Sequence, residues 1–359
     1  MRIWSQSLIA VVQNFAPADL VLTFDKSCIN NNNSIQSSTT TAATPAAADK
    51  LFELNNRGVL EKLNLPERII VTANHQIYAD WVYIWCISQL ANQHGSLKIL
   101  LKDSLKNLPI YGLGMQFFDF IFLKRKLADD EKTIIDNLGR SKKDGTPLWL
   151  VLFPEGTVIS NSTRKRSKDF AEKNNLKDNI YTLLPRSTGL RLCIQSLGES
   201  VEWIYDFTIG YPGIKPGENP EDIYTIPKIF FFDQQPRKIH VYIKRFRIKD
   251  IPVDDETEFS KWVYQRWQEK DSLMAYFYKE GSFPNQHEEK EKEKKNEKDN
   301  DDRKSLSTND QQSILTKEVS IKLFNPIRKL AQPTLCLLPY LPIIFSIYSL
   351  GRYIYSYLF

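Results

Sequence analysis

Histidine and cysteine are both scarce in this chain, which has four of each among 359 residues. The cysteines lie far apart and form no C-x-x-C pair, so the sequence supports neither a disulfide framework nor a zinc site. The net charge is only +5, which is too small to demand nucleic acid and is equally compatible with an anionic membrane surface. Since 42% of the residues are hydrophobic, wholesale disorder is excluded. We expect a reducing, cytosol-facing active domain.

Long apolar runs are rare as well, with one exception near the C-terminus. The run "SLIAVVQNF" (7–15) is too short to span a bilayer, whereas "LCLLPYLPIIFSIYSL" (335–350) is almost entirely apolar. Pro339 and Pro342 argue against a straight helix there. A kinked span, a re-entrant hairpin and an interfacial anchor all stay open, with a buried terminal hairpin as the alternative. We interpret this segment as a membrane attachment.

Two biased segments divide the chain. Residues 28–50 are rich in Asn, Ser, Thr and Ala and form a low-complexity insertion, and residues 283–316 form a charged linker. The insertion separates an N-terminal segment (1–27) from one domain (51–282), and the linker separates this domain from a hydrophobic membrane segment (317–359).

Short apolar runs and amphipathic stretches alternate within residues 51–282. The runs predict strands at 68–73, 147–153, 203–211 and 238–246. Helices are expected at 80–93, 127–145, 189–200 and 256–278, with Gly198 as a C-cap. This alternation predicts an α/β fold with a central, largely parallel sheet flanked by helices.

The stretch "NHQIYADW" (74–81) places a scarce histidine directly after the first predicted strand. On a continuous helix His75 and Asp80 would be separated by about 140° and would not face each other. A turn between them would let Asp80 fix the imidazole tautomer and leave the other ring nitrogen as a base, at the carboxyl end of a strand. In the alternative interpretation, Asp80 is a helix N-cap and His75 is a loop residue that donates to a carbonyl.

Three further stretches carry polar residues after apolar runs. In "LVLFPEGT" (150–157), Glu155 lies at the same predicted sheet edge as His75, and Gly156 permits a tight turn; a helix start with Glu155 on the macrodipole is the alternative. "FIFLKRK" (120–126) is either a solvated basic turn or a phosphate site beside a membrane. In "LLPRSTGL" (183–190), Pro185 and Gly189 bracket a predicted turn.

These four stretches, in this order, resemble the glycerophospholipid acyltransferase family, which includes the lysophosphatidic acid acyltransferases. The family blocks appear here as "NHQIYAD", "GMQFFDFIFLKR", "FPEGT" and "LLPRSTGL". The sequence around these blocks is most similar to the lysocardiolipin and lysophosphatidylinositol acyltransferase branch, in particular the stretches "FPEGTVISNSTRKRSKDFAEKNNL" and "RWQEKDSLMAYFY". The resemblance covers roughly residues 51 to 282.

The resemblance implies direct acyl transfer from acyl-CoA to the free glycerol hydroxyl of a lysophospholipid. His75 would be the general base and Asp80 its orienting partner. The implied substrate-binding residues are Arg125 for the acceptor phosphate, Glu155, Gly156 and Thr157 for the rest of the acceptor pocket, and Pro185 in the block linked with acyl-CoA. No cofactor or metal is implied beyond acyl-CoA as co-substrate.

The implied partners are the two substrates and a membrane, and the implied location is the endoplasmic reticulum with a cytosol-facing site. No G-x-S-x-G elbow occurs, so a serine intermediate is not expected. Two other functions stay open, namely an acyl-CoA thioesterase and a non-catalytic membrane lipid-binding protein of the same fold. Nucleic-acid binding through "RKRSK" (164–168) lacks a recognition motif.

Overall fold

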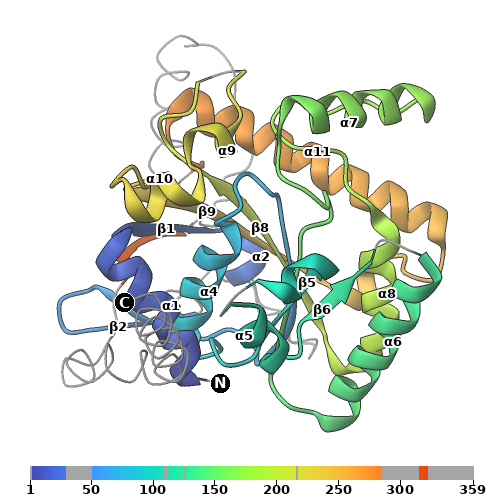
Figure 1. Ribbon diagram of the computed structural model, residues 1–359, viewed down its shortest axis with the longest axis horizontal. Helices are drawn as coiled ribbons and strands as arrows, with labels where there is room; N and C mark the ends of the chain where they lie inside the picture. The colour runs from blue at the N-terminus through green and yellow to red at the C-terminus, as the bar shows by residue number, and fades with distance from the viewer. Residues whose placement is uncertain are drawn as a thin grey trace, which may run out of the picture.

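The computed structural model describes residues 2–29, 51–108, 111–124, 127–215, 217–284 and 315–321. These residues form one eight-stranded sheet with helices packed on both faces, together with a small two-stranded ribbon (Figure 1). The ribbon pairs β2 (Phe52–Leu54) with β3 (Leu60–Leu63).

The large sheet is mixed but mostly parallel. Its strands, in order across the sheet, are β10 (Leu315–Ser320), β1 (Asp19–Phe24), β9 (Lys238–Arg247), β8 (Trp203–Gly210), β4 (Arg68–Ala73), β7 (Leu148–Leu152), β5 (Leu97–Lys102) and β6 (Ile121–Leu123). All neighbours from β8 to β6 are parallel, as are β9 and β1, whereas β8–β9 and β1–β10 are antiparallel. The predicted largely parallel sheet is confirmed, and the four predicted strands are β4, β7, β8 and β9.

Helices cover both faces, as predicted. On one face lie α1 (Arg2–Phe15), α4 (Asp80–Leu90) and α5 (Tyr111–Phe117). On the other lie α6 (Leu127–Asp144), α8 (Ser187–Leu197) and α11 (Glu256–Glu280). The remaining helices are α2 (Lys26–Ile29), α7 (Asn161–Lys173), α9 (Pro220–Ile223), α10 (Ile226–Phe231) and the 3-10 turns at Asp103–Asn107, Gly198–Ser200 and Ile248–Asp250.

The apolar runs became strands because both faces of the sheet are buried. In β4, Ile69 and Val71 belong to the core that contains α1 and α4, whereas Ile70 between them belongs to the core that contains α6, α8 and α11. Successive strand residues point to opposite faces, so a strand covered on both sides needs an unbroken apolar run. β7 is the extreme case, since all five of its residues are buried.

The four predicted helices form as α4, α6, α8 and α11, with small shifts at their ends. Gly198 ends α8 with a φ of +51°, which confirms the predicted C-cap. α8 begins at Ser187, earlier than expected, so Gly189 lies inside this helix and not in the turn before it.

The sheet extends beyond residues 51–282, the limits predicted for the domain. β1 comes from the N-terminal segment and pairs with β9 along its whole length, and five of its six residues are buried. β10 lies across the predicted boundary between linker and membrane segment, and its charged residues are typical of an edge strand.

The rest of the predicted insertion, the linker and the membrane segment lie outside the described residues. Across the described ranges, every helix is too short or too polar to cross a membrane.

Candidate active site

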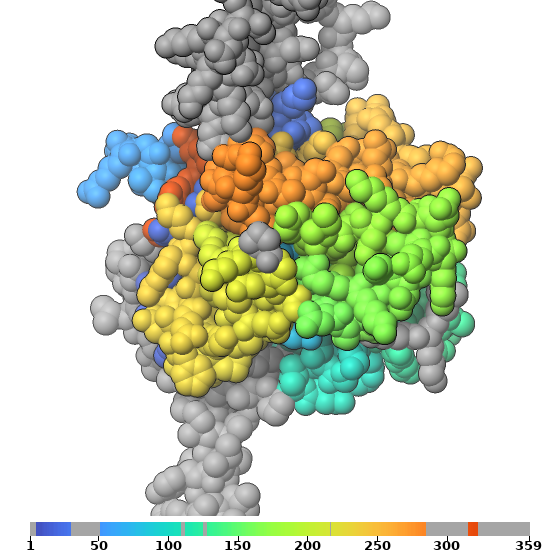
Figure 2. All heavy atoms as spheres, turned by 90° about the horizontal axis from the view of Figure 1, so that it is seen from above, coloured from blue at the N-terminus to red at the C-terminus, as the bar shows by residue number. Residues whose placement is uncertain are grey.

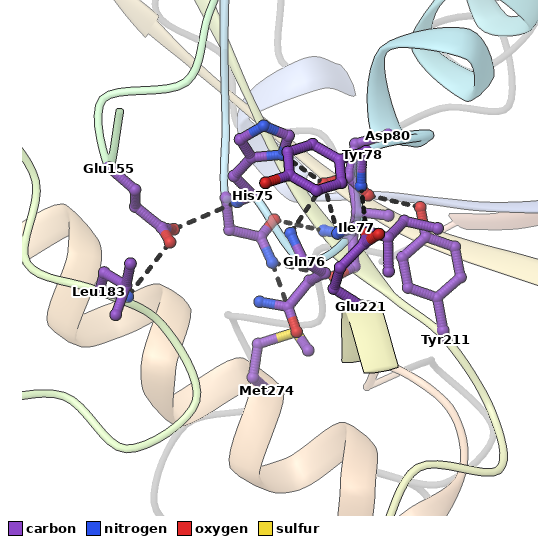
Figure 3. Close-up of polar contacts among 12 residues, drawn as sticks. His75, Gln76, Ile77, Tyr78, Asp80, Glu155, Leu183, Tyr211, Glu221 and Met274 are labelled. Atoms are coloured by element: carbon purple, nitrogen blue, oxygen red, sulfur yellow. Dashed lines mark hydrogen bonds and ion pairs between the residues drawn. The ribbon is translucent and has the colours of Figure 1, made fainter. Parts of the chain in front are cut away.

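The candidate site lies at one edge of the sheet, where three neighbouring parallel strands end. His75 follows β4, Glu155 follows β7, and Tyr211 comes directly after β8. Parallel strands bring their carboxyl ends to the same edge, which is where open α/β sheets bind ligands. Figure 3 shows His75, Asp80, Glu155 and Tyr211 gathered there.

Asn74 fixes the point at which the chain leaves β4. Its side-chain oxygen accepts from the backbone N–H of Ile209 at 2.7 Å, and its amide nitrogen donates to the carbonyl of the same residue at 2.9 Å. These two side-chain bonds take the place of further backbone hydrogen bonds between β4 and β8. The following residue, His75, is thereby free to turn away from the sheet.

Asp80 is fully buried and accepts hydrogen bonds on both carboxylate oxygens. Its Oδ2 lies 2.9 Å from His75 Nδ1 and accepts from the backbone N–H groups of Gln76 at 2.7 Å and Ile77 at 3.1 Å. Its Oδ1 accepts from the Tyr211 hydroxyl at 2.5 Å. The five-residue loop therefore folds the carboxylate back onto the imidazole, as the functional interpretation of "NHQIYADW" requires.

The alternative interpretation of Asp80 as a helix N-cap is wrong. α4 begins at Asp80 with Ala79 at the N-cap position, and no side chain caps this helix. The carboxylate bonds to the loop that precedes the helix, so its task is to hold the loop and His75.

His75 is oriented by contacts on two sides. Its side chain is 15% exposed, and its ring stacks on Phe153 with centroids 4.3 Å apart. With Nδ1 bonded to Asp80, the nitrogen that can accept a proton is Nε2, which has no hydrogen-bond partner within the described part of the chain. Such a pair can remove a proton from a bound hydroxyl group.

Glu155 is a second buried carboxyl, and it joins separate parts of the site. Its Oε1 accepts from the backbone N–H of His75 at 3.3 Å and from the indole of Trp267 at 3.1 Å, while Oε2 accepts from the N–H of Leu183 at 3.2 Å. Burial raises the pKa of Glu155 to about 8, although these donors and the Lys270 charge lower it. The alternative of a helix start is wrong, because α7 begins only at Asn161.

The other residues of the third and fourth blocks lie beside Glu155. Gly156 has a φ of +72° in the turn after β7, a conformation that favours glycine, and Thr157 follows in a half-buried bend. Pro185 is buried, and the N–H of the next residue, Arg186, donates to the carbonyl of Pro154 at 2.8 Å. The structure thus brings "FPEGT" and "LLPRSTGL" into direct contact.

Arg125 lies outside the described residues, so its phosphate-binding role stays a prediction. The neighbouring Lys124 is exposed, and its backbone N–H donates to Asp130 at the start of α6. Among the residues that the structure describes, no group of three or more His, Cys, Asp or Glu side chains is placed to hold a metal ion.

Sequence reasoning missed Lys270, which is 1% exposed in the middle of α11. Its ammonium lies 2.7 Å from Asp206 of β8 and donates to the carbonyl of Phe207 at 2.8 Å. A signal was present, because Lys270 interrupts the apolar stripe of α11 formed by the buried residues Val263, Trp267, Met274 and Phe277.

Sequence reasoning also missed Glu221 and Tyr211. Glu221, on α9, accepts from the backbone N–H of Tyr78 at 2.6 Å, and burial raises its pKa to about 7. Nothing in the pattern around Glu221 distinguishes it from an ordinary surface acid. Tyr211 is the last residue of the strand predicted at 203–211, but only the folded structure places its hydroxyl on Asp80.

Comparison with known proteins shows the family to which the chain belongs. The family model described as acyltransferase matches residues 57–208, and the one described as acyltransferase C-terminus matches residues 230–302. An uncharacterized acyltransferase of Schizosaccharomyces pombe is 38% identical over 275 residues, which make up 77% of this chain and 72% of that relative. This chain belongs to the acyltransferase family. The family predicted from the four sequence blocks is therefore confirmed.

Two further relatives of this acyltransferase have more specific names. The 2-acyl-1-lysophosphatidylinositol acyltransferase of Saccharomyces cerevisiae is 38% identical over 253 residues, covering 61% of this chain and 64% of the relative. Lysocardiolipin acyltransferase 1 of Gallus gallus is 35% identical over 218 residues, covering 60% of this chain and 55% of the relative. The predicted likeness to these two kinds of acyltransferase is confirmed, although this chain spans less than two thirds of either.

Proposed function

We propose that this acyltransferase transfers a fatty acyl chain from acyl-CoA to the free glycerol hydroxyl of a lysophospholipid. The observation that carries the proposal is the 2.9 Å contact between His75 Nδ1 and the buried Asp80 Oδ2 at the carboxyl end of β4. This pair supplies a general base of fixed orientation at the edge of the sheet.

The mechanism needs one base and no covalent enzyme intermediate. His75 Nε2 takes the proton from the glycerol hydroxyl as its oxygen attacks the thioester carbonyl. The tetrahedral intermediate then collapses, the C–S bond breaks, and the coenzyme A thiolate takes the proton from the imidazolium. Asp80 stabilises the imidazolium between these two proton transfers, because its carboxylate is held by four donors away from water.

Glu155, Gly156 and Thr157 form the acceptor pocket next to this base in our proposal, with Arg125 binding the acceptor phosphate. Support comes from the hydrogen bond between Glu155 and the backbone of His75, which ties the pocket to the base. Pro185 lies in the block assigned to acyl-CoA, and this block is bonded to the "FPEGT" turn. Both substrates would therefore meet at His75.

The acceptor class is proposed from the relatives, whose names specify lysophosphatidylinositol and lysocardiolipin. Lysophosphatidic acid is the third acceptor type, and all three carry the phosphate that Arg125 would bind. Because acceptor and product are membrane lipids, we propose that the protein acts at a membrane, with the endoplasmic reticulum as the compartment and the site facing the cytosol.

The test is coenzyme A release by membranes that contain the full chain, supplied with an acyl-CoA and a panel of lysophospholipids. Wild type and His75→Ala are compared, with membranes lacking the chain as background. We expect release that requires one class of lysophospholipid and disappears in His75→Ala, with the acyl chain recovered in the phospholipid product.

Three results would contradict the proposal. Equal release without any lysophospholipid would identify a thioesterase, since water would then be the acceptor. Full activity in His75→Ala would show that the His75–Asp80 pair is not the base. Binding of lysophospholipid without any release would indicate a lipid-binding protein of the same fold.

A further inference from the structure

One face of α11 is directed at the candidate site, although this helix lies outside the match to the acyltransferase family model at 57–208. The face consists of Trp267, Lys270, Asp271, Met274 and Tyr278 and is named here the inner face. Counted from Trp267, the other four residues follow at three, four, seven and eleven positions, which places all five side chains along one side of the helix. Figure 2 shows α11 (orange) beside the α7 segment (green) and the α9–α10 segment (yellow) on one side of the molecule.

Trp267 reaches the site through Glu155. The indole N–H donates to Glu155 Oε1 at 3.1 Å, and that same oxygen accepts from the backbone N–H of His75. Trp267 is 2% exposed and Glu155 is 4% exposed, so water does not compete for these bonds. The indole thereby fixes the carboxyl that holds the histidine backbone.

Asp271, one turn further along α11, holds the segment that leads into "LLPRSTGL". Its carboxylate accepts from three successive backbone N–H groups, at 3.1 Å from Ile180, 2.6 Å from Tyr181 and 3.0 Å from Thr182. The next residue, Leu183, donates to Glu155. Four successive residues of the chain that leads into the fourth block, 180 to 183, are thus bonded to a carboxylate on α11 or to one held by α11.

Tyr278 and Met274 contact the loop that carries the base. The Tyr278 hydroxyl donates to Gln76 Oε1 at 3.2 Å, and the backbone N–H of Gln76 donates to Asp80. The Met274 sulfur lies 3.9 Å from the side-chain nitrogen of Asn74, and Figure 3 shows Met274 extending from the helix toward this loop. The inner face therefore touches the residues on both sides of His75.

Lys270 fixes the helix on the sheet. Besides its ion pair with Asp206, its ammonium lies 5.2 Å from the centroid of the Trp267 ring, over the ring face. Rotation of α11 about its axis would break this buried ion pair, which is costly. The angular position of Trp267 is therefore set by a charge pair that lies directly beside it.

From these contacts we infer that α11 is a positioning helix for the reaction, in which Trp267, Asp271 and Tyr278 place three loops around His75. The three loops are 74–80, 153–157 and 180–186. The inference rests on the proposed acyl transfer and adds that a helix of the region matching the acyltransferase C-terminus belongs to the catalytic unit.

The test compares Trp267→Phe with Trp262→Phe in the full chain. Trp262 is an indole on the same helix whose ring packs on Phe246 and Phe259, away from Glu155, and it serves as the matched control. Each variant is assayed for kcat, for KM of the lysophospholipid, for the pH dependence of kcat and for thermal unfolding. Tyr278→Phe, which loses only a hydroxyl, provides a second variant.

We expect Trp267→Phe to lower kcat by up to about tenfold, the upper end of the effect of losing one buried hydrogen bond, with KM little changed. The indole N–H lowers the pKa of Glu155, so its loss should raise that pKa further. Because Glu155 holds the backbone of His75, the pH profile of kcat should shift to higher pH with it. Trp262→Phe should keep the wild-type kcat and pH profile. Tyr278→Phe should lower kcat about fivefold.

The outcomes separate this inference from the proposed function. An inactive wild type would overturn the proposed function itself. An active wild type with wild-type kcat in Trp267→Phe and Tyr278→Phe would overturn the inference alone. Equal losses in Trp267→Phe and Trp262→Phe, with an unchanged pH profile, would also overturn it, since they would show only general packing.

Discussion

Asp80→Asn removes the negative charge next to His75 while keeping the size of the side chain. In the wild type, Oδ2 lies against His75 Nδ1 and accepts from the N–H groups of Gln76 and Ile77, while Oδ1 accepts from the Tyr211 hydroxyl. An asparagine with its oxygen in the Oδ2 position keeps the loop and the ring in place. Its amide nitrogen then faces the Tyr211 oxygen, which can accept a hydrogen bond. The substitution therefore removes charge and leaves the loop geometry.

The size of the effect follows from the imidazolium that forms when His75 takes the substrate proton. Two unit charges about 4 Å apart attract each other by about 4 kcal/mol at an effective dielectric constant of about 20. A hydrogen bond to a charged group contributes about 1.5 to 3 kcal/mol. Since 1.36 kcal/mol corresponds to a tenfold change in rate, kcat should fall by about 10- to 1000-fold.

The assay is coenzyme A release with the lysophospholipid that gives the highest activity in the panel, at saturating concentrations of both substrates. We expect KM for the lysophospholipid to stay within about threefold of the wild type, because the charge acts mainly in the transition state. Tyr211→Phe is the control, since it removes a neutral donor from the same carboxylate and should lower kcat less than about tenfold. A loss below about threefold in Asp80→Asn, in a folded protein, would refute the role of Asp80 as the stabiliser of His75.

Two further predictions concern the other buried charges. Burial raises the pKa of Glu155 from 4.5 to about 8, so the folded state holds its proton more tightly than the unfolded state, and the free energy of unfolding should fall by at most about 4 kcal/mol between about pH 4.5 and pH 8. Glu155→Gln should flatten this fall in denaturation experiments over that range, and an unchanged slope would show that Glu155 does not cause it. Lys270→Met leaves the Asp206 carboxylate buried without its cation and should lower the free energy of unfolding by about 3 to 5 kcal/mol. Adding Asp206→Asn should recover part of this loss, and no recovery in chemical denaturation would show that the ion pair is not its source.

The centre of the sheet could be predicted because burial on both faces leaves a local signal. β4 and β7 are unbroken apolar runs, so each is recognisable without knowing its neighbours. The edge strands leave a weaker signal. In β10 the residues Lys317 and Glu318 are typical of a solvated edge, and only pairing with β1 reveals the strand.

The candidate site likewise has one part that the sequence predicts and another part that only the folded structure shows. His75 and Asp80 lie five residues apart, so one turn brings them together, and the sequence predicts that turn as one of two alternatives. Trp267 and Glu155 are 112 positions apart, and their hydrogen bond depends on how α11 crosses the sheet. The interruption of an apolar helical stripe by Lys270 marks the helix as unusual, but it does not identify Asp206 as the partner.

The loops of the site share one physical solution to the hydrogen bonding of their backbone. After β4, and again between α7 and α8, the chain runs as a loop, so its backbone N–H groups have no partners within a helix or strand. Three carboxylates satisfy these groups, with Asp80 accepting from residues 76 and 77, Glu155 from residues 75 and 183, and Asp271 from residues 180 to 182. Only Asp80 also touches the imidazole. The other two carboxylates hold the loops and do not touch the imidazole ring. Replacing either one should therefore disturb the placement of His75 only through the loops.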